Sequence, residues 1–409
     1  QDVIQTMTTL SEQIIAKEAK HILQVYKRIP IMFVRGQGSH LIDEHGQKYL
    51  DLLSGIGVAS LGHAHTKLAD TIGKQAHELL HTSNLYFHPL QAEVASHLSR
   101  LSGLTRTFFC NSGTEAVEAC LKFARRYWYS QGDKNRSGIV AFDGSFHGRT
   151  FGSLSVTAGE AYRAPFSPLL PGIQFVSPLD IDQIKRAITD QTAAVIVEPI
   201  QGEGGVRPIP TETAQALADI CSTTQTLLIA DEVQCGLGRT GQPFYSSMLG
   251  LTPDLMALGK ALGAGIPIGA ALLSEKVSSS VSYGDHGSTY GGNPLACQAA
   301  LVFLSALEDG LIQRVSDAGE RLRSGLEKLV STSDELHEVR GAGLMCGIEV
   351  DIAVADQIVN TALEHKLLIN RTAGTVVRLL PPLTISNEDI DDGLIRLRAA
   401  FSDAGAQFH

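Results

Sequence analysis

The middle of the chain carries a repeated pattern of short apolar runs separated by segments with helical apolar spacing. Seven of these runs read as β-strands: residues 107–110, 139–142, 173–176, 193–197, 227–230, 255–258 and 268–273. Strands that alternate with helices usually pair in parallel, because each crossover helix returns the chain to the same edge of the sheet. The pattern therefore predicts an α/β fold with a mainly parallel sheet of seven strands.

Both ends of the chain carry patterns that predict a smaller α+β unit. Residues 11–27 have helical apolar spacing, and residues 38–55 alternate around a turn near Glu44 to Gly46, as a hairpin does. Helices are also predicted over residues 65–81, 89–102 and 294–329, and strands near 343–350 and 376–380. We expect an N-terminal segment (1–62) that joins the small domain, a large cofactor-binding domain (63–305) and a C-terminal α+β domain (306–409).

Composition is that of an acidic globular protein with a large core. The 409 residues are 44% hydrophobic, and the net charge of -10 argues against a nucleic-acid surface, which needs clustered Lys and Arg. We expect no apolar run long enough to span a membrane, and residues 1–13 lack the basic and apolar regions of a signal peptide. The six cysteines form no Cys-x-x-Cys pair, which favours a reducing compartment. We expect a cytoplasmic protein; the missing initiator Met leaves open whether a leading segment was removed.

Two charged residues stand at the ends of two predicted strands. The run 227–230 is followed by Asp231, and the run 254–259 is followed by Lys260. Ligands of open α/β sheets bind at the carboxyl ends of the strands. A lysine there is expected to be partly buried, where its pKa falls and its neutral amine becomes a nucleophile toward aldehydes. The alternative is a surface lysine that extends its charged end into water.

A Ser-Gly-Thr turn between a predicted strand and a predicted helix forms a candidate anion site. Backbone N–H groups near Ser112, Gly113 and Thr114 would point out of the helix start, where the helix dipole also favours negative charge. The alternative is that Ser112 or Thr114 only caps the helix, with Glu115 in its first turn.

Two further glycine-rich loops follow predicted strands. The first places Phe146, which can stack on a planar ring, beside Arg149, which can clamp a carboxylate. The second carries the carboxylates Glu198 and Glu203. An anion site, a stacking aromatic, a strand-end carboxylate and a strand-end lysine on one sheet together suit pyridoxal 5'-phosphate.

Two motifs favour other chemistry only weakly. His77 to His81 reads H-E-x-x-H, as in zinc hydrolases, but His81 falls at the predicted end of its helix and no third ligand motif follows. Gly236 to Gly241 reads G-x-G-x-x-G, but no apolar helix follows it, so a dinucleotide site is not expected. We expect no metal. A DNA-binding regulator would need a basic helix-turn-helix extension, for which the short N-terminal segment has no room.

These residues belong to motifs that resemble the class III, ornithine-type aminotransferases over essentially the whole chain. The motifs are HTSNLYF (81–87), NSGTEAVEA (111–119), FHGRT (146–150), EPIQGEGG (198–205), DEVQCGLGRTG (231–241), ALGKALGAGIPIGA (257–270), GSTYGGNPLA (287–296) and VVRLLPPL (376–383). The resemblance implies fold type I of the pyridoxal-phosphate enzymes, with a mixed seven-stranded sheet and a small α+β domain built from both chain ends. It also implies an obligate homodimer with shared sites.

The resemblance implies roles for particular residues. Lys260 would hold pyridoxal 5'-phosphate covalently and move the proton, and Asp231 would keep the ring nitrogen protonated. The other implied cofactor contacts are Gly113, Thr114, Phe146, Val233, Gln234 and, from the neighbouring subunit, Thr289. The implied substrate contacts are Arg149, Arg378, Glu203 and Ser288.

The implied reaction moves the terminal (δ) amino group of N2-acetyl-L-ornithine to 2-oxoglutarate, as in arginine biosynthesis. Glu203 would neutralise Arg378 while the amine donor occupies the site. Ile56 stands where relatives that bind free ornithine are expected to carry a tyrosine, and an apolar residue suits an acylated amine better. Succinylornithine, ornithine, 4-aminobutyrate or another ω-amine donor remains open as the substrate.

Overall fold

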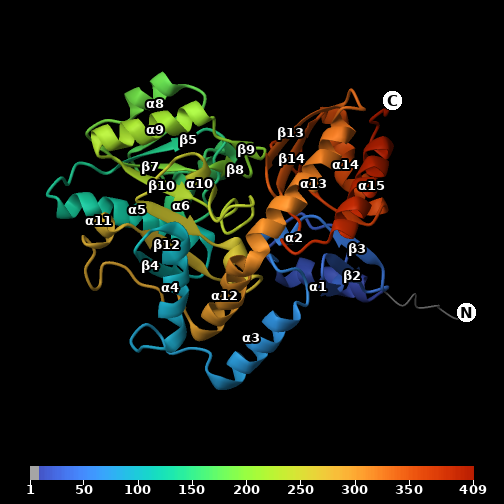
Figure 1. Ribbon diagram of the computed structural model, residues 1–409, viewed down its shortest axis with the longest axis horizontal. Helices are drawn as coiled ribbons and strands as arrows, with labels where there is room; N and C mark the ends of the chain where they lie inside the picture. The colour runs from blue at the N-terminus through green and yellow to red at the C-terminus, as the bar shows by residue number, and fades with distance from the viewer. Residues whose placement is uncertain (1–8) are drawn as a thin grey trace, which may run out of the picture.

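The seven predicted strands form one sheet in the computed structural model, which describes residues 9–409 (Figure 1). Each observed boundary lies within one residue of the predicted one. Along the sheet the strands are β4 (Arg106–Cys110), β12 (Gly269–Leu273), β11 (Leu255–Leu258), β10 (Leu227–Asp231), β7 (Thr192–Val197), β5 (Gly138–Phe142) and β6 (Ile173–Val176). Six of the strands run in one direction, and β12 runs antiparallel to β4 and β11 on either side of it. It follows β11 after a short 3₁₀ turn, η2 (Lys260–Gly263), and without a crossover helix the chain must reverse.

Both faces of this sheet are buried, because alternate residues of each central strand pack against different helices. Ile139, Ala194 and Ile229 pack with α5 (Gly113–Ser130) on one face. Their neighbours Val140, Val195 and Leu228 pack on the other face with α8 (Ile181–Ala187) and α9 (Thr211–Thr224). At the β4 end, α4 (Pro89–Ser102) and α12 (Pro294–Ala306) belong to the largest apolar cluster. The carboxyl ends of the parallel strands stay uncovered by helices.

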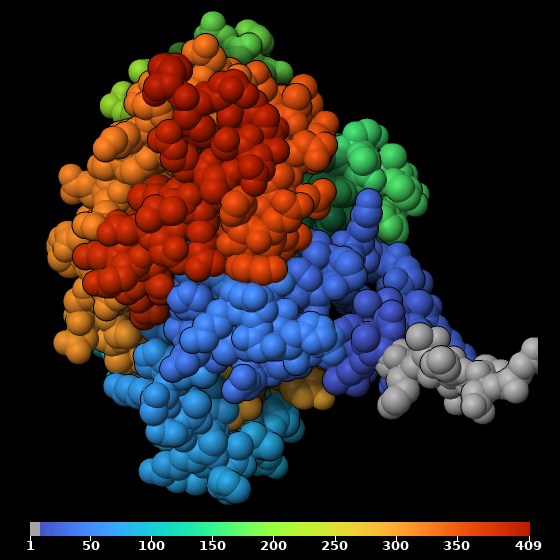
Figure 2. All heavy atoms as spheres, turned by 90° about the vertical axis from the view of Figure 1, so that its right-hand side faces the viewer, coloured from blue at the N-terminus to red at the C-terminus, as the bar shows by residue number. Residues whose placement is uncertain are grey.

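The two ends of the chain build a second unit beside the large sheet (Figure 2). The strand β3 pairs in parallel with β15, so an N-terminal hairpin and a C-terminal strand share one sheet. The two small sheets run β1-β2-β3-β15 and β13-β14-β17-β16. Their bounds are β1 (Phe33–Gln37), β2 (His40–Asp43), β3 (Lys48–Asp51), β15 (Leu367–Leu368), β13 (Leu336–Ala342), β14 (Met345–Val350), β17 (Val376–Leu379) and β16 (Asn370–Thr372), with α14 (Ile352–Glu364) and α15 (Asn387–Asp403) packed nearby. The hairpin agrees with the predicted one, and β1 was not predicted. The domain boundaries stay a prediction.

The first helix is shorter than predicted. The helix α1 (Leu10–His21) begins at a capping box between Thr9 and Glu12 and ends before residue 27. Ile22 is already extended, and the side chain of Gln24 donates to the carbonyls of Glu18 and Ile22. The carbonyl of Glu18 already accepts from the N–H of Ile22, so Gln24 adds a second bond there and satisfies the Ile22 carbonyl, which has lost its helical partner.

The predicted helix over residues 294–329 has a break. α12 continues through a π-turn, η3 (Leu307–Leu311), into α13 (Ile312–Val330), and Gly310 within the π-turn has a left-handed φ of 92°. By length and composition the whole span Pro294–Val330 could cross a membrane, which corrects the prediction that no segment is long enough. Half of its most apolar part is buried inside the protein, and the core helix of a globular domain meets the same criterion.

Short elements fill the remaining connections. They are α2 (Ser54–Gly57), α3 (Thr66–Glu78), α6 (Phe151–Ser155), α7 (Glu160–Arg163), η1 (Ala164–Phe166), β8 (Ile200–Gln201), β9 (Arg207–Pro208), α10 (Tyr245–Met248) and α11 (Glu275–Ser278).

Candidate active site

A pocket of about 250 Å³ lies at the carboxyl ends of the central strands. Nine of the twelve predicted site residues line it: Gly113, Thr114, Phe146, Arg149, Glu203, Asp231, Val233, Gln234 and Lys260. The remaining three lining residues, His147, Gly148 and Glu198, were not among the predicted site residues. Of the other predicted residues, Arg378 reaches the pocket through an ion pair, whereas Ser288 and Thr289 do not line it.

Asp231 ends β10 and is fixed by two hydrogen bonds. Its Oδ2 lies 2.7 Å from Nδ1 of His147, and its Oδ1 accepts from the backbone N–H of Val233 at 3.0 Å. The carboxylate is 5% exposed and the imidazole is fully buried. His147 therefore sets the direction in which this carboxylate points. The histidine of the F-H-G-R-T motif was visible in the sequence, but only the fold brings it to Asp231.

Lys260 begins the 3₁₀ turn after β11 and has strained backbone geometry. Its φ is 36°, in the left-handed region that costs a non-glycine residue on the order of 1 kcal/mol or more. Burial lowers the pKa of the Lys260 amine from its ordinary value, an effect that the nearby Glu203 carboxylate partly opposes. Backbone strain of this kind persists only where the surrounding structure holds it. The backbone of Lys260 is therefore fixed, and its side chain lines the pocket.

The start of α5 has the predicted cap, and the residues of the predicted anion site follow it directly. The hydroxyl of Ser112 accepts from the N–H of Glu115 at 3.3 Å, so Ser112 is the N-cap. Gly113 and Thr114 follow it and line the pocket. A Cβ added to Gly113 would lie 2.6 Å from Cγ1 of Val233, so only glycine lets that side chain and the helix start approach so closely. Capping and anion binding are therefore compatible at this turn.

The loop after β5 is held from two sides. The backbone N–H of Phe146 donates to Oε1 of Glu198 at 2.9 Å, and the N–H of Gly202 donates to Oε2 of the same carboxylate at 3.1 Å. Burial raises the pKa of Glu198 to about 7; His147 lowers it and Asp231 raises it further. Glu198 thereby ties the loop that carries Phe146 to the loop that carries Glu203.

The exposed residue Arg149 sits at the pocket mouth. Its guanidinium carbon lies 3.9 Å from the centre of the Tyr162 ring and 5.6 Å from the centre of the Phe146 ring. Within residues 9–409 no ion pair to Arg149 is present, so its fork of N–H groups is open to a carboxylate.

Arg378 on β17 is paired instead. Its Nη1 lies 2.6 Å from Oε1 of Glu203 and 3.3 Å from Oε1 of Gln234, and its side chain is 1% exposed. Burial acts to raise the pKa of the Glu203 carboxyl, but the charge and hydrogen bond of Arg378, with smaller effects from Lys260 and Thr372, together bring the pKa below its ordinary value. Arg149 is therefore available to a substrate carboxylate, whereas Arg378 is already paired with Glu203.

Ser288 and Thr289 lie on a loop outside this pocket. The hydroxyl of Ser288 accepts from the N–H of Gly291 at 2.9 Å and lies 3.4 Å from Nδ2 of Asn111. Thr289 is exposed. Ser288 therefore lies close to the residue that precedes α5. Neither Ser288 nor Thr289 lines the pocket of its own chain.

The alternative zinc motif does not form a helix face. The helix α3 ends at Glu78, so His77 lies on it and His81 lies beyond it. Among the described residues no group of three His, Cys, Asp or Glu side chains is placed to hold a metal ion.

The pocket residues fit pyridoxal 5'-phosphate. Gly113 and Thr114 place the start of α5 in the pocket lining, where its N–H groups suit a phosphate; the buried pair of His147 and Asp231 suits a protonated ring nitrogen, and Lys260 offers an amine for the aldehyde. Gln234 and Val233 lie between these groups on the loop after Asp231.

Comparison with known proteins agrees with this arrangement. The family model "Aminotransferase class-III" matches residues 22–401. The acetylornithine aminotransferase of Methanocaldococcus jannaschii is 45% identical over 94% of this chain and 97% of its own length.

Two solved structures are similar in fold. The acetylornithine aminotransferase of Elizabethkingia anophelis has a TM-score of 0.85 at 31% identity, covering 97% of this chain and 100% of its own. An amine transaminase from an uncultivated Pseudomonas species, solved with pyridoxal phosphate bound, has a TM-score of 0.87 at 29% identity over 94% and 97%. The predicted fold class, enzyme class and cofactor are confirmed. A family match over most of the chain and a sheet of the expected composition lead to one conclusion: the chain belongs to the class III aminotransferases.

Proposed function

We propose that this aminotransferase moves the terminal amino group of N2-acetyl-L-ornithine to 2-oxoglutarate, giving N-acetylglutamate 5-semialdehyde and glutamate. The observation that carries the proposal is the pairing of Arg378 with Glu203 at 2.6 Å while Arg149 stays open. A donor whose only carboxylate is distant from its reacting amine needs one arginine, and a dicarboxylate needs two. If Glu203 can move away from Arg378, the same pocket can accept both the monocarboxylate donor and the dicarboxylate 2-oxoglutarate.

The residues around the cofactor divide the chemistry between them. When bound, pyridoxal phosphate supplies an aldehyde that carries the amino group between substrates and a ring that withdraws electrons from the reacting carbon. Lys260 binds that aldehyde and, once displaced, carries the proton to and from the reacting carbon, for which a lowered pKa suits it. Asp231, oriented by His147, stabilises the positive charge on the ring nitrogen.

The remaining pocket residues orient the cofactor and exclude water. Phe146 and Val233 line the pocket and would pack against the ring, and Gln234 would donate to its phenolic oxygen. Gly113 and Thr114 bind the phosphate from the start of α5.

The substrate contacts follow from the two arginines. Arg149 binds the α-carboxylate of the acetylated donor in one half-reaction and the distal carboxylate of 2-oxoglutarate in the other. Arg378 binds the α-carboxylate of 2-oxoglutarate or glutamate after Glu203 moves away. Ile56, which is partly exposed, suits the acyl group better than a charged amine. Succinylornithine, ornithine and 4-aminobutyrate are the alternative donors.

The assembly we propose is a homodimer that acts in arginine biosynthesis in the cytoplasm, without membrane or nucleic-acid partners. Thr289 would complete the phosphate site of the neighbouring subunit, with Ser288 beside the donor substrate. Thr289 is exposed and does not line the pocket of its own chain, which supports a contact with the neighbouring subunit.

A donor panel tests the substrate. Glutamate formation from 2-oxoglutarate is measured with acetylornithine, succinylornithine, ornithine and 4-aminobutyrate as donors. We expect the highest kcat/KM with acetylornithine; a higher value with ornithine or 4-aminobutyrate would overturn the choice of donor.

The variant Lys260→Ala tests the enzyme class independently of the donor. We expect it to lose the visible absorption band of the covalently held cofactor and to lose turnover with every donor. Lys276→Ala on α11 is the matched control and should keep both. A Lys260→Ala protein that retains the band would refute the assignment.

A further inference from the structure

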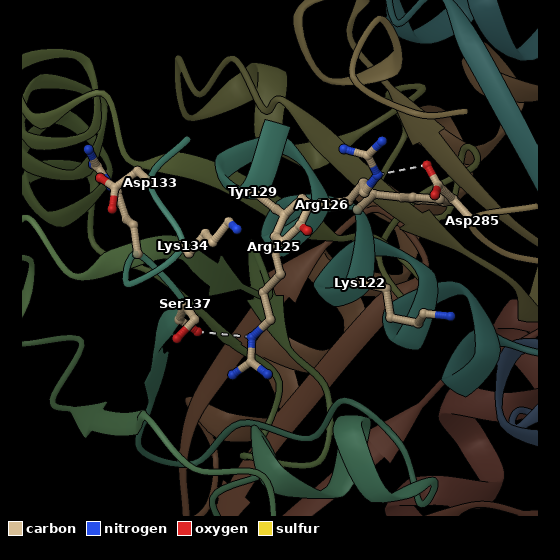
Figure 3. A pocket seen from close by; sticks show the side chains of 10 residues that line it. Lys122, Arg125, Arg126, Tyr129, Asp133, Lys134, Ser137 and Asp285 are labelled. Atoms are coloured by element: carbon tan, nitrogen blue, oxygen red, sulfur yellow. Dashed lines mark hydrogen bonds and ion pairs between the residues drawn. The ribbon is translucent and has the colours of Figure 1, made fainter. Parts of the chain in front are cut away.

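A second pocket, of about 410 Å³, lies on the solvent side of α5, away from the residues that line the candidate active site (Figure 3). Lys122, Arg125, Arg126 and Tyr129 come from successive turns of α5 and share one face of that helix. The opposite wall is the turn that leads into β5, which contributes Lys134 among other residues.

Positive charge dominates this pocket. Five of its ten lining residues are Lys or Arg, the fifth being Arg136, and two are carboxylates, Asp133 and Asp285. The whole chain has a net charge of -10, so this concentration of cations runs against the charge of the molecule. Five cations against two carboxylates leave a net positive lining, which raises the local concentration of anions.

Two of the cations are held in place without a carboxylate partner. Nε of Arg125 donates to the carbonyl of Ser137 at 2.9 Å, and its Nη2 donates to the carbonyl of Pro171 at 3.2 Å. Arg136 donates to the carbonyls of Thr192 and Thr224 in the same way. Carbonyl oxygens fix the side chains but leave their charge unneutralised. The pocket is therefore preorganised for an anion, which reduces the ordering cost of binding one.

An exposed aromatic ring stands among these cations. The ring of Tyr129 is 58% exposed, and Nζ of Lys134 lies 5.1 Å from its centre, with the guanidinium carbon of Arg126 at 5.9 Å. Arg126 is also ion-paired with Asp285 at 2.7 Å and Nζ of Lys122 lies 2.8 Å from Nδ1 of His286, so a ligand would share these two cations with residues of the protein. A planar group can stack on the free part of the ring while an attached chain of anionic groups meets the cations.

We propose that this pocket binds a polyphosphate group, either free or attached to a nucleoside, at a site separate from the cofactor. Several cations in a cavity of this size match a ligand with closely spaced negative charges better than a single carboxylate. Tyr129 adds stacking for a nucleobase. The same helix begins at the cofactor site with Gly113, so both sites are built on α5.

The test uses the holoenzyme, whose cofactor already fills the first phosphate site. Tripolyphosphate and ATP are titrated by calorimetry at low and at physiological salt, with the variants Lys134→Gln, Arg126→Gln and the double variant. We expect one salt-sensitive site per chain, weakened about tenfold by each neutralised cation. Lys328→Gln on α13 removes one exposed charge elsewhere and should leave the affinity unchanged. ATP binding more tightly than tripolyphosphate would identify a nucleoside ligand, and equal affinity would identify the phosphate chain alone as the determinant.

Three outcomes would overturn the proposal. They are no heat of binding up to millimolar ligand, equal affinity in the double variant and the unmodified protein, and binding of a long polyanion such as heparin without binding of either small probe. The cofactor absorption band and basal transamination of the variants, measured in parallel, separate this result from any failure of the proposed function, because neither Lys134 nor Arg126 lies in the active-site pocket.

Discussion

Replacing Glu198 with glutamine should change how stability depends on pH. The Glu198 carboxyl is 7% exposed and accepts from the backbone N–H groups of Phe146 and Gly202. Burial raises the pKa of this carboxyl from 4.5 to about 7. The folded protein therefore holds a proton that the unfolded chain releases, so the unfavourable ionisation of Glu198 grows as pH rises from about 4.5 and is complete above about 7.

The magnitude follows from the size of the shift. A carboxyl with these two pKa values costs the folded state roughly 1 kcal/mol at pH 5 and roughly 3 kcal/mol at pH 8. Glutamine does not titrate, but its NH₂ group would face a backbone N–H, which costs about 1–3 kcal/mol at every pH. The free energy of unfolding of Glu198→Gln relative to the unmodified protein should therefore rise by about 2 kcal/mol from pH 5 to pH 8.

Equilibrium unfolding in urea at pH 5, 6, 7 and 8 measures this difference, with protein and cofactor concentrations held constant because both shift apparent stability. Glu212→Gln, an exposed position in the first turn of α9, is the matched control and should show a difference that does not vary over this range. A Glu198→Gln difference that is constant or that falls with pH would refute the reasoning, because it would mean that the buried carboxyl is ionised at no cost.

Two further substitutions test packing and charge at the site. Glu203→Gln leaves Arg378 without its anionic partner, so the affinity for 2-oxoglutarate should rise about tenfold or more, while kcat/KM for the monocarboxylate donor should fall. Steady-state kinetics with each substrate measure the two effects. Equal changes in kcat/KM for 2-oxoglutarate and for the donor would contradict the prediction. Gly113→Ala places a Cβ 2.6 Å from Val233 Cγ1, so cofactor affinity should fall and stability should drop by about 1–3 kcal/mol. Gly73→Ala, where a Cβ meets no atom within 4 Å, is its control, and equal effects of the two substitutions would contradict the steric argument.

The main sheet could be predicted because its five inner strands are buried on both faces. Continuous apolar runs of four to six residues between helical patterns are typical of buried strands in a parallel sheet. The antiparallel direction of β12 did not follow from this pattern. It depends on the short connection after Lys260, which the sequence displays only as glycine-rich loop residues.

The peripheral elements were harder to predict for a local reason. The strand β1 is mostly exposed and carries no clear alternation, so hydrogen bonds to β2 define it rather than its composition. At the end of α1 the Gln24 side chain donates to the carbonyl of Ile22, which would bond to a backbone N–H if the helix continued. Neither signal is visible in a pattern of apolar positions.

The missed residues His147 and Glu198 depend on strand order, which a single sequence does not contain. Asp231 ends β10, Glu198 follows β7, and His147 follows β5, and the sheet places these three strands side by side in the order β10-β7-β5. In the sequence 84 residues separate His147 from Asp231, yet β7 alone lies between their strands. Because the carboxyl ends of neighbouring parallel strands meet at one edge, any polar residue at those ends becomes a neighbour of the others. Strand order therefore brings His147 to 2.7 Å from Asp231 and places the Glu198 carboxyl where both groups act on its pKa, although the three residues are far apart in the sequence.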